Sequence, residues 1–157
     1  MSDAPGPAKR RKAPSATRLR QRARHCVVQA LYQAQVNPQQ PVELVAQFRA
    51  DNDFEDVDVG YFDEAVLAVL RRADELDLLF APLLDRALDE LDPVELGILR
   101  LATWELSERT DVPYRVVIDE AVNLAKRFGA SESHRYVNGV LDRAARSLRG
   151  PETGARA

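Results

Sequence analysis

Apolar residues recur at spacings of three and four along almost the whole chain. This spacing is typical of amphipathic α-helices, whose buried side chains return to one face about every 3.6 residues. No stretch alternates apolar and polar residues over a convincing strand length. The pattern therefore predicts an all-α protein of about seven helices.

Proline, glycine and polar connectors separate the predicted helices, which lie at about residues 16–36, 41–48, 62–73, 76–88, 93–107, 113–128 and 131–148. The helix at 93–107 has the broadest apolar face, because Leu99, Trp104 and Leu106 extend its apolar stripe. We therefore expect this helix to be central in the fold.

Local signals mark two helix boundaries clearly. Asp92 can accept a backbone N–H as N-cap, and Pro93 has the φ of a first helical residue. Glu95 stands where a capping-box carboxylate reaches back to the cap. Gly129 follows an apolar stripe that ends at Phe128, so it is a predicted C-cap.

The two ends of the chain differ from the middle. Residues 1–15 are rich in proline and basic residues and poor in large apolar ones, which predicts a disordered basic arm. Gly150 and Pro151 break the last predicted helix, so residues 150–157 are expected to be an unstructured tail. A single helical domain is expected over residues 16–149.

Charge is distributed unevenly. Residues 1–24 contain eight basic residues and one acid, a net charge of +7, whereas residues 25–157 contain 14 basic and 24 acidic residues, a net charge of −10. A basic segment on an acidic body is suited to binding a polyanion at one edge and a basic partner elsewhere.

Composition excludes several classes of protein. Apolar residues (45%) and charged residues (30%) are close to the values of ordinary soluble domains. No apolar run approaches the roughly 20 residues of a membrane span, and the basic N-terminus lacks the apolar region of a signal peptide. Cys26, His25 and His134 do not form a set with metal-site spacing. We expect a cytoplasmic protein without membrane contact or bound metal.

The arginines of the first helix are the first candidate site. At about 100° per residue, Arg20 and Arg24 fall at one border of the apolar stripe, and Arg18 and Arg22 lie on the far side. Each guanidinium fork suits phosphate oxygens and can stack on a base. The alternative is a solvated charged face, but the density of cations favours nucleic acid.

The second candidate site is the connection FGASESHRY, residues 128–136. Phe128 and Tyr136 bracket it, and Lys126 and Arg135 add cations. Aromatic rings beside cations in a loop suit single-stranded RNA, whose bases stack on them. The alternative is that the two rings close small apolar clusters.

Enzymatic interpretations have little support. The chain has no glycine-rich phosphate loop and no G-x-S-x-G elbow. Its carboxylates concentrate in a connector and at helix starts, where solvation and the helix dipole account for them. The two histidines are better explained as surface or capping residues than as general bases. We expect no catalytic residue and no cofactor.

Four segments resemble the NusB family of transcription antitermination factors, in the same order and spacing: RARHCVVQALYQAQ (22–35), DVDVGYF (56–62), LRLATWELSERTDVPYRVVIDEAVNLAKRFG (99–129) and SHRYVNGVLDRA (133–144). The resemblance implies a fold of two small helical bundles. It also implies binding of boxA, a short single-stranded sequence in ribosomal RNA leader transcripts, together with NusE, a small-subunit ribosomal protein. The pair is expected to act on the RNA polymerase elongation complex with NusA and NusG and to suppress premature termination.

The resemblance also implies site residues. The RNA-contacting positions match Arg20, Arg22 and Arg24, with Arg18 as an addition, and the aromatic pair matches Phe128 and Tyr136 with Glu132 between them. The positions facing NusE match Tyr32, Asp89 and Glu95. Leu83 stands where some members carry an aromatic that touches RNA.

Two alternatives remain open from the sequence. The N-terminal domain of ribosomal RNA cytosine methyltransferases shares the helical fold, but it needs a following catalytic domain, which we do not expect because the sequence ends at Ala157. A helical adaptor that binds only protein would use the basic arm for solubility or targeting. The sequence does not decide between monomer and homodimer.

Overall fold

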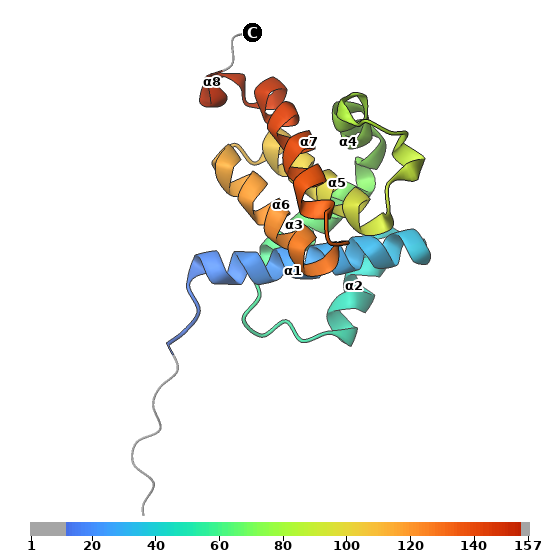
Figure 1. Cartoon of the computed structure of the whole chain (residues 1–157). Coiled ribbons are helices and arrows are strands. Elements are labelled where there is room, and N and C mark those ends of the chain that lie inside the picture. The colour runs from blue at the N-terminus through green and yellow to red at the C-terminus, as the bar shows by residue number, and fades with distance from the viewer. Residues whose placement is uncertain (1–11, 155–157) are drawn as a thin grey trace, which may run out of the picture.

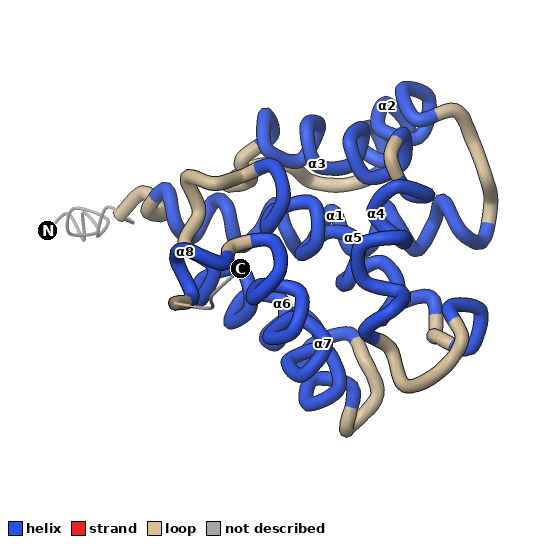
Figure 2. The backbone as a smooth tube through the Cα atoms, turned by 90° about the horizontal axis from the view of Figure 1, so that it is seen from above, coloured by secondary structure: helices blue, strands red, loops and turns tan. Residues whose placement is uncertain are grey.

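The computed structural model describes residues 12–154 of the chain. Most of the predicted basic arm lies outside this range, as do residues 155–157, while residues 12–15 lead into the first helix without regular structure. The described residues form eight α-helices and two short 3₁₀ helices and contain no strand (Figure 2). The all-α prediction is confirmed.

Most helices begin and end close to the proline, glycine and polar residues that were predicted to separate them. Their bounds are α1 Ala16–Val36, α2 Pro41–Asp51, α3 Val59–Arg71, α4 Ala73–Phe80, α5 Pro93–Glu108, α6 Tyr114–Phe128, α7 Ser133–Leu148 and α8 Gly150–Thr153, with 3₁₀ helices η1 Ala81–Leu83 and η2 Leu88–Glu90. Asp92 caps α5 by accepting the backbone N–H of Glu95 at 2.8 Å, as predicted. Gly129 follows α6 and donates its N–H to the Ala125 carbonyl at 2.8 Å.

Two groups of helices share one core. In the first, α1, α2 and α3 contact one another, and in the second, α4, α6 and α7 pack around α5. Contacts between α1 and α5 join the groups, and Figure 1 shows α1 crossing beneath α6 and α7. The buried apolar side chains form a single cluster that runs through both groups.

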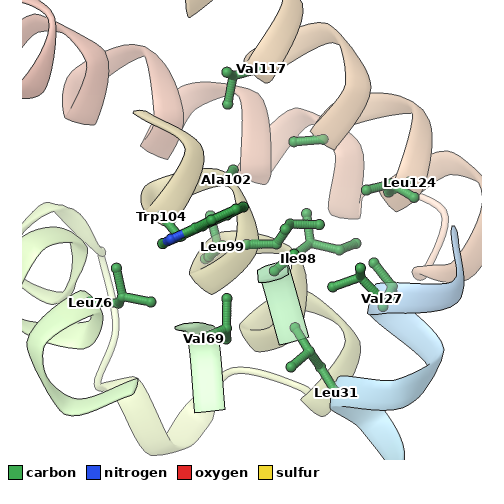
Figure 3. Close-up of a cluster of buried hydrophobic side chains, with 14 of the residues drawn as sticks. Val27, Leu31, Val69, Leu76, Ile98, Leu99, Ala102, Trp104, Val117 and Leu124 are labelled. Atoms are coloured by element: carbon green, nitrogen blue, oxygen red, sulfur yellow. The ribbon is translucent and has the colours of Figure 1, made fainter. Parts of the chain in front are cut away.

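Helix α5 is the central element, as its apolar pattern predicts. Figure 3 shows Ile98, Leu99 and Trp104 of α5 among side chains from the surrounding helices. Each of these three residues is at most 3% exposed. Helix α1 packs closely on α5 at Gly97, where a Cβ would make an ordinary van der Waals contact of 3.6 Å with the Cβ of Leu31. A helix that is apolar on nearly all sides is stable only when surrounded in this way.

The predicted fourth helix is wrong in its second half. It was expected to continue to Leu88, but α4 ends at Phe80 and is followed by η1 and an irregular segment. Pro82 lies in η1, and its missing N–H and fixed ring are incompatible with continuation of an α-helix. The apolar side chains that suggested a helix, Leu83, Leu84 and Leu88, still pack against the core from this irregular segment.

The expectation of an unstructured tail is wrong for residues 150–153, which form α8. The anchor is Arg149, which is 5% exposed. Its guanidinium donates to the carbonyls of Glu105 and Leu106 in the last turn of α5 at 3.1 and 2.6 Å. It also binds the Glu152 carboxylate of α8 at 2.7 Å. Arg149 thus adds a charged donor to the last carbonyls of α5, of which Glu105 also accepts the Arg109 N–H, and ties α8 to them.

Candidate nucleic-acid interface

The N-terminal half of α1 presents cations on its outward face. Ser15 begins the helix by accepting the backbone N–H of Arg18 at 3.1 Å. Arg18, Arg22 and His25 follow at spacings of four and three, so they share one face. The Arg18 guanidinium is exposed and makes no ion pair within the described part of the chain. Arg18 is therefore open to an external anion.

Arg20 lies between the outward face and the core. Its guanidinium is 3.2 Å from the Asp58 carboxylate and 4.3 Å from the centre of the Tyr61 ring. The side chain remains 29% exposed. Arg20 can therefore contribute to a basic surface, but only part of its hydrogen-bonding capacity is free.

Arg24 does not belong to the surface, and its predicted RNA contact is wrong. Its side chain is 4% exposed and forms a two-pronged pair with Glu105 of α5, each N–O distance being 3.0 Å. Burial by itself lowers the pKa of Arg24, but the hydrogen bonds and charge of Glu105 outweigh this and hold the pKa above its ordinary value. Arg24 links α1 to α5, and its guanidinium is engaged by Glu105 and not presented on the outward face.

Helix α6 completes the outward surface beside α1. The His25 and Phe128 rings meet edge to face with their centres 5.8 Å apart, and the Arg127 guanidinium lies 5.4 Å from the centre of the Phe128 ring. Burial, followed by repulsion from Arg127 and Arg18, lowers the pKa of His25. We call the surface formed by Arg18, Arg22, His25, Arg127 and Phe128 the cationic face.

Two members of the cationic face, His25 and Arg127, were absent from the predicted site. The spacing of seven residues from Arg18 to His25 is a signal that could have placed the histidine on the outward face. Arg127 is the residue before Phe128, so the sequence alone places it beside that ring. The contact of Phe128 with His25 depends on how α6 packs against α1, which local sequence does not show. Lys126 is exposed in the same last turn of α6.

Tyr136 lies in a different cluster from Phe128. The Arg86 guanidinium covers its ring at 4.1 Å from the centre, and Asp85 holds that guanidinium at 2.8 Å. Burial, followed by the Asp85 charge, raises the pKa of Tyr136. Between the two aromatic rings, Glu132 and Arg135 form an ion pair at 3.3 Å in which both side chains are more than 70% exposed.

Both rings also contribute to the core, as the alternative interpretation expects. Phe128 and Tyr136 are partly buried and pack against the apolar cluster. Each ring nevertheless contacts a cation from outside that cluster. Packing and ligand contact are therefore compatible at these two positions.

The predicted NusE-facing residues separate in the structure. Tyr32 of α1 is 46% exposed beside a groove of about 400 Å³ that is also lined by Val36 and Phe48. Asp89 in η2 is exposed. Glu95 is only 7% exposed and accepts a hydrogen bond from the Ser133 hydroxyl at 2.6 Å. The assignment of Glu95 as a partner contact is therefore wrong, and its carboxylate instead joins α5 to the start of α7.

Within residues 12–154, no group of three or more histidine, cysteine, aspartate or glutamate side chains could hold a metal ion. The helices in this range include none that is long and apolar enough to cross a membrane.

The fold and the cationic face define a class of protein. Its members are small and all-helical, with arginines on the outward face of α1 and an aromatic ring of α6 beside them. Similarity to known proteins narrows this class. The chain belongs to the NusB family, whose model matches residues 21–146.

Relatives within the family match over most of the chain. It is 51% identical to "Transcription antitermination protein NusB" of Pseudomonas fluorescens, over 90% of this chain and 86% of that protein. It is 52% identical to the protein of the same name from Pectobacterium carotovorum subsp. carotovorum, over 83% of this chain and 94% of that protein. The solved structure of T. maritima NusB superposes with a TM-score of 0.72 at 32% identity, covering 80% of this chain and 89% of that one.

Proposed function

We propose that this protein is a noncatalytic transcription antitermination factor that binds single-stranded boxA RNA of ribosomal RNA leader transcripts. In this proposal it acts with NusE and helps RNA polymerase, together with NusA and NusG, to resist premature termination. The name shared by its relatives supports this class of function. The observation that carries the RNA-binding part is the contact of the Phe128 ring with His25 and Arg127, beside the outward face of α1 on which His25 lies with Arg18 and Arg22.

The cationic face suits a single strand better than a duplex. Arg18, Arg22 and Arg127 supply guanidinium groups that can bind successive phosphates of a flexible backbone. Phe128 supplies a ring on which an unstacked base can lie, and stacking of this kind contributes about 1–3 kcal/mol per base. Phosphate contacts would provide affinity for any sequence, and ring contacts would provide the preference for boxA.

The surface around Tyr136 extends the proposed RNA path. Its ring lies under Arg86, so a base that stacks there either displaces this guanidinium or lies against its outer face. Lys126 lies just before Phe128, and Glu132 and Arg135 lie between the two rings; all three are exposed. We assign them to the RNA-facing surface, with Glu132 as a hydrogen-bond acceptor for base amino groups.

The NusE contact is assigned to Tyr32 and Asp89. Tyr32 combines a large exposed ring with a neighbouring groove, a combination common in protein interfaces. The net charge of −10 over residues 25–157 suits a basic ribosomal protein. The proposal also places the protein in the cytoplasm, where RNA polymerase works.

Titration of boxA RNA and of a scrambled RNA, each with and without NusE, tests the proposal. We expect tighter binding to boxA than to the scrambled RNA, and a further gain when NusE is present. If about four to six phosphates are neutralised, log affinity against log salt should have a slope of about −3 to −4. Equal binding of both RNAs, or a slope near zero, would contradict the proposal and favour a protein-only adaptor.

A further inference from the structure

An acidic connector joins α2 to α3 and returns to the N-terminal half of α1 (Figure 1). We define it as residues 53–58, which carry Asp53, Glu55, Asp56 and Asp58. Its end is attached to α1 by a backbone hydrogen bond of 3.1 Å from the Asp58 N–H to the Leu19 carbonyl. The segment richest in acids therefore lies against the helix that carries the proposed RNA-binding arginines.

The connector is held in place on both sides of Asp56. On one side, Phe54 packs edge to face against Phe62, with ring centres 4.8 Å apart. On the other side, Val57 packs against the core, and the Asp58 carboxylate caps α3 by accepting the Tyr61 N–H at 3.1 Å. Because its neighbours are anchored, Asp56 is held at a fixed place beside α1.

Asp56 faces Arg22 from this turn. Its Oδ2 lies 3.4 Å from Nη1 of Arg22, and the two side chains are 46% and 37% exposed. Asp56 has a φ of 58°, the one left-handed conformation at a non-glycine residue within residues 12–154. This conformation is uncommon outside glycine and is best tolerated by aspartate and asparagine. Within the described chain, the Asp56 carboxylate has Arg22 as its ion-pair partner and no other.

We propose that Asp56 is an intramolecular competitor of RNA phosphate for Arg22, and that it sets the affinity for RNA below the level the arginines alone would give. A carboxylate and a phosphate are both anions that attract the same guanidinium, so an Arg22 held toward Asp56 is less available to a phosphate. This inference rests on the proposed RNA-binding function. It also explains why a helix so rich in arginine is accompanied by an acidic connector.

Asp56 and Asp58 differ in what their removal would change. Asp58 pairs with Arg20 but also caps α3, so its loss would disturb the fold. Asp56 makes one contact in a half-exposed position, so its loss would mainly free Arg22. Asp56→Asn is therefore the informative variant, since it removes the charge and keeps both the size and a residue that tolerates a positive φ.

The experiment measures boxA affinity of the full chain against salt concentration for the wild type and Asp56→Asn. We expect the variant to bind about two- to five-fold more tightly, the range that corresponds to losing one exposed ion pair. Its salt slope should be steeper by up to about 0.7, as for one additional phosphate contact. Asp56→Gly, which also accepts the left-handed conformation, serves as a second variant if the first folds poorly.

Glu55→Gln is the matched control. It removes one negative charge from the neighbouring position, where the side chain makes no ion pair within the described residues. A gain in Asp56→Asn that Glu55→Gln lacks, and that disappears in an Arg22→Ala background, supports the inference. Equal effects of the two acid replacements, or a gain that persists without Arg22, overturn it. Failure of the wild type to bind RNA would instead overturn the proposed function.

Discussion

The two faces of the first half of α1 use arginine for opposite purposes. On the inward face, Arg24 is 4% exposed and locked to Glu105. On the outward face, Arg18 and Arg22 are accessible, and among residues 12–154 the ion-pair partner of Arg22 is the half-exposed Asp56. Arg22 and Arg24 are two positions apart, so about 200° of helical rotation decides whether an arginine stabilises the fold or can bind a ligand.

This comparison shows why a count of basic residues overstates the binding surface. A buried pair is costly to break, because removal of one partner leaves an uncompensated charge in the core. An exposed pair contributes little to stability and can exchange partners in water. The same guanidinium group therefore has different consequences for folding and for binding.

The largest expected effect is on the inward face. Replacing Arg24 with Met should lower the free energy of unfolding by about 3–5 kcal/mol, because the Glu105 carboxylate stays buried without its partner. Urea denaturation measures this loss. The double replacement of Arg24 and Glu105 by Met should recover much of it, and the folded fraction should bind RNA as the wild type does. If Arg24→Met alone were as stable as the wild type, a structural role for Arg24 would be contradicted.

Arg149 is a second buried arginine, near the C-terminal end of the fold, and should behave like Arg24. Arg149→Ala should destabilise the protein by about 2–4 kcal/mol, since the Glu105 and Leu106 carbonyls of α5 and the Val112 carbonyl before α6 lose a charged donor. Hydrogen exchange should report early opening of α8 and of the start of α6. Arg149→Lys is the matched control and should restore only part of the stability, because one ammonium cannot reach all these carbonyls. Unchanged exchange in α8 would rule out the anchoring role.

On the outward face, replacing arginines should weaken RNA binding and leave the stability of the fold nearly unchanged. Replacing Arg18 and Arg22 together with Ala should weaken boxA binding about tenfold, or about 1.4 kcal/mol, and reduce the salt slope by about 0.7 for each lost phosphate contact. The melting temperature should change little, because both side chains are accessible. Two exposed arginines on other helices, Arg71 of α3 and Arg146 of α7, provide a control of equal charge change. Equal losses in the two double variants would show that overall charge, and not the cationic face, attracts RNA.

The smallest expected effect concerns His25. Its pKa lies below the ordinary 6.5 in the free protein, so the imidazole is neutral near pH 7.5. A bound phosphate would favour the imidazolium and raise this pKa, so the added affinity is present at low pH and is lost as pH rises through the pKa of the complex. Between pH 7.5 and 5.5, boxA affinity should rise about two- to five-fold more for the wild type than for His25→Gln. Parallel pH profiles would exclude His25 from the RNA contact.

Most of the fold could be predicted because its signals are local. The Asp92-Pro93 start of α5 and the Gly129 end of α6 need only neighbouring residues, and the apolar stripes place the core faces. The predicted extension of α4 to Leu88 was wrong because the apolar spacing was given more weight than Pro82. Because Pro82 is present in the sequence, the end of α4 before it can be predicted from the sequence.

The candidate site could be predicted only in part. The burial of Arg24 depends on Glu105, which is 81 positions away in the chain. Helical spacing separates Arg24 from Arg22, but no local pattern separates it from Arg20. The burial of Glu95 similarly depends on Ser133 of another helix. Helix packing therefore decides which of several similar charged residues reach the surface, while sequence spacing identifies the candidates.

The most direct test of the cationic face is to follow backbone amide resonances of the protein by NMR while boxA RNA is added. The account predicts the largest shifts in two segments, residues 18–25 of α1 and residues 126–129 at the end of α6, with smaller shifts around Arg86 and Tyr136. Scrambled RNA should perturb the arginine-bearing segment and leave Phe128 less affected. Shifts confined to the Tyr32 groove, or absent from both segments at saturation, would contradict it.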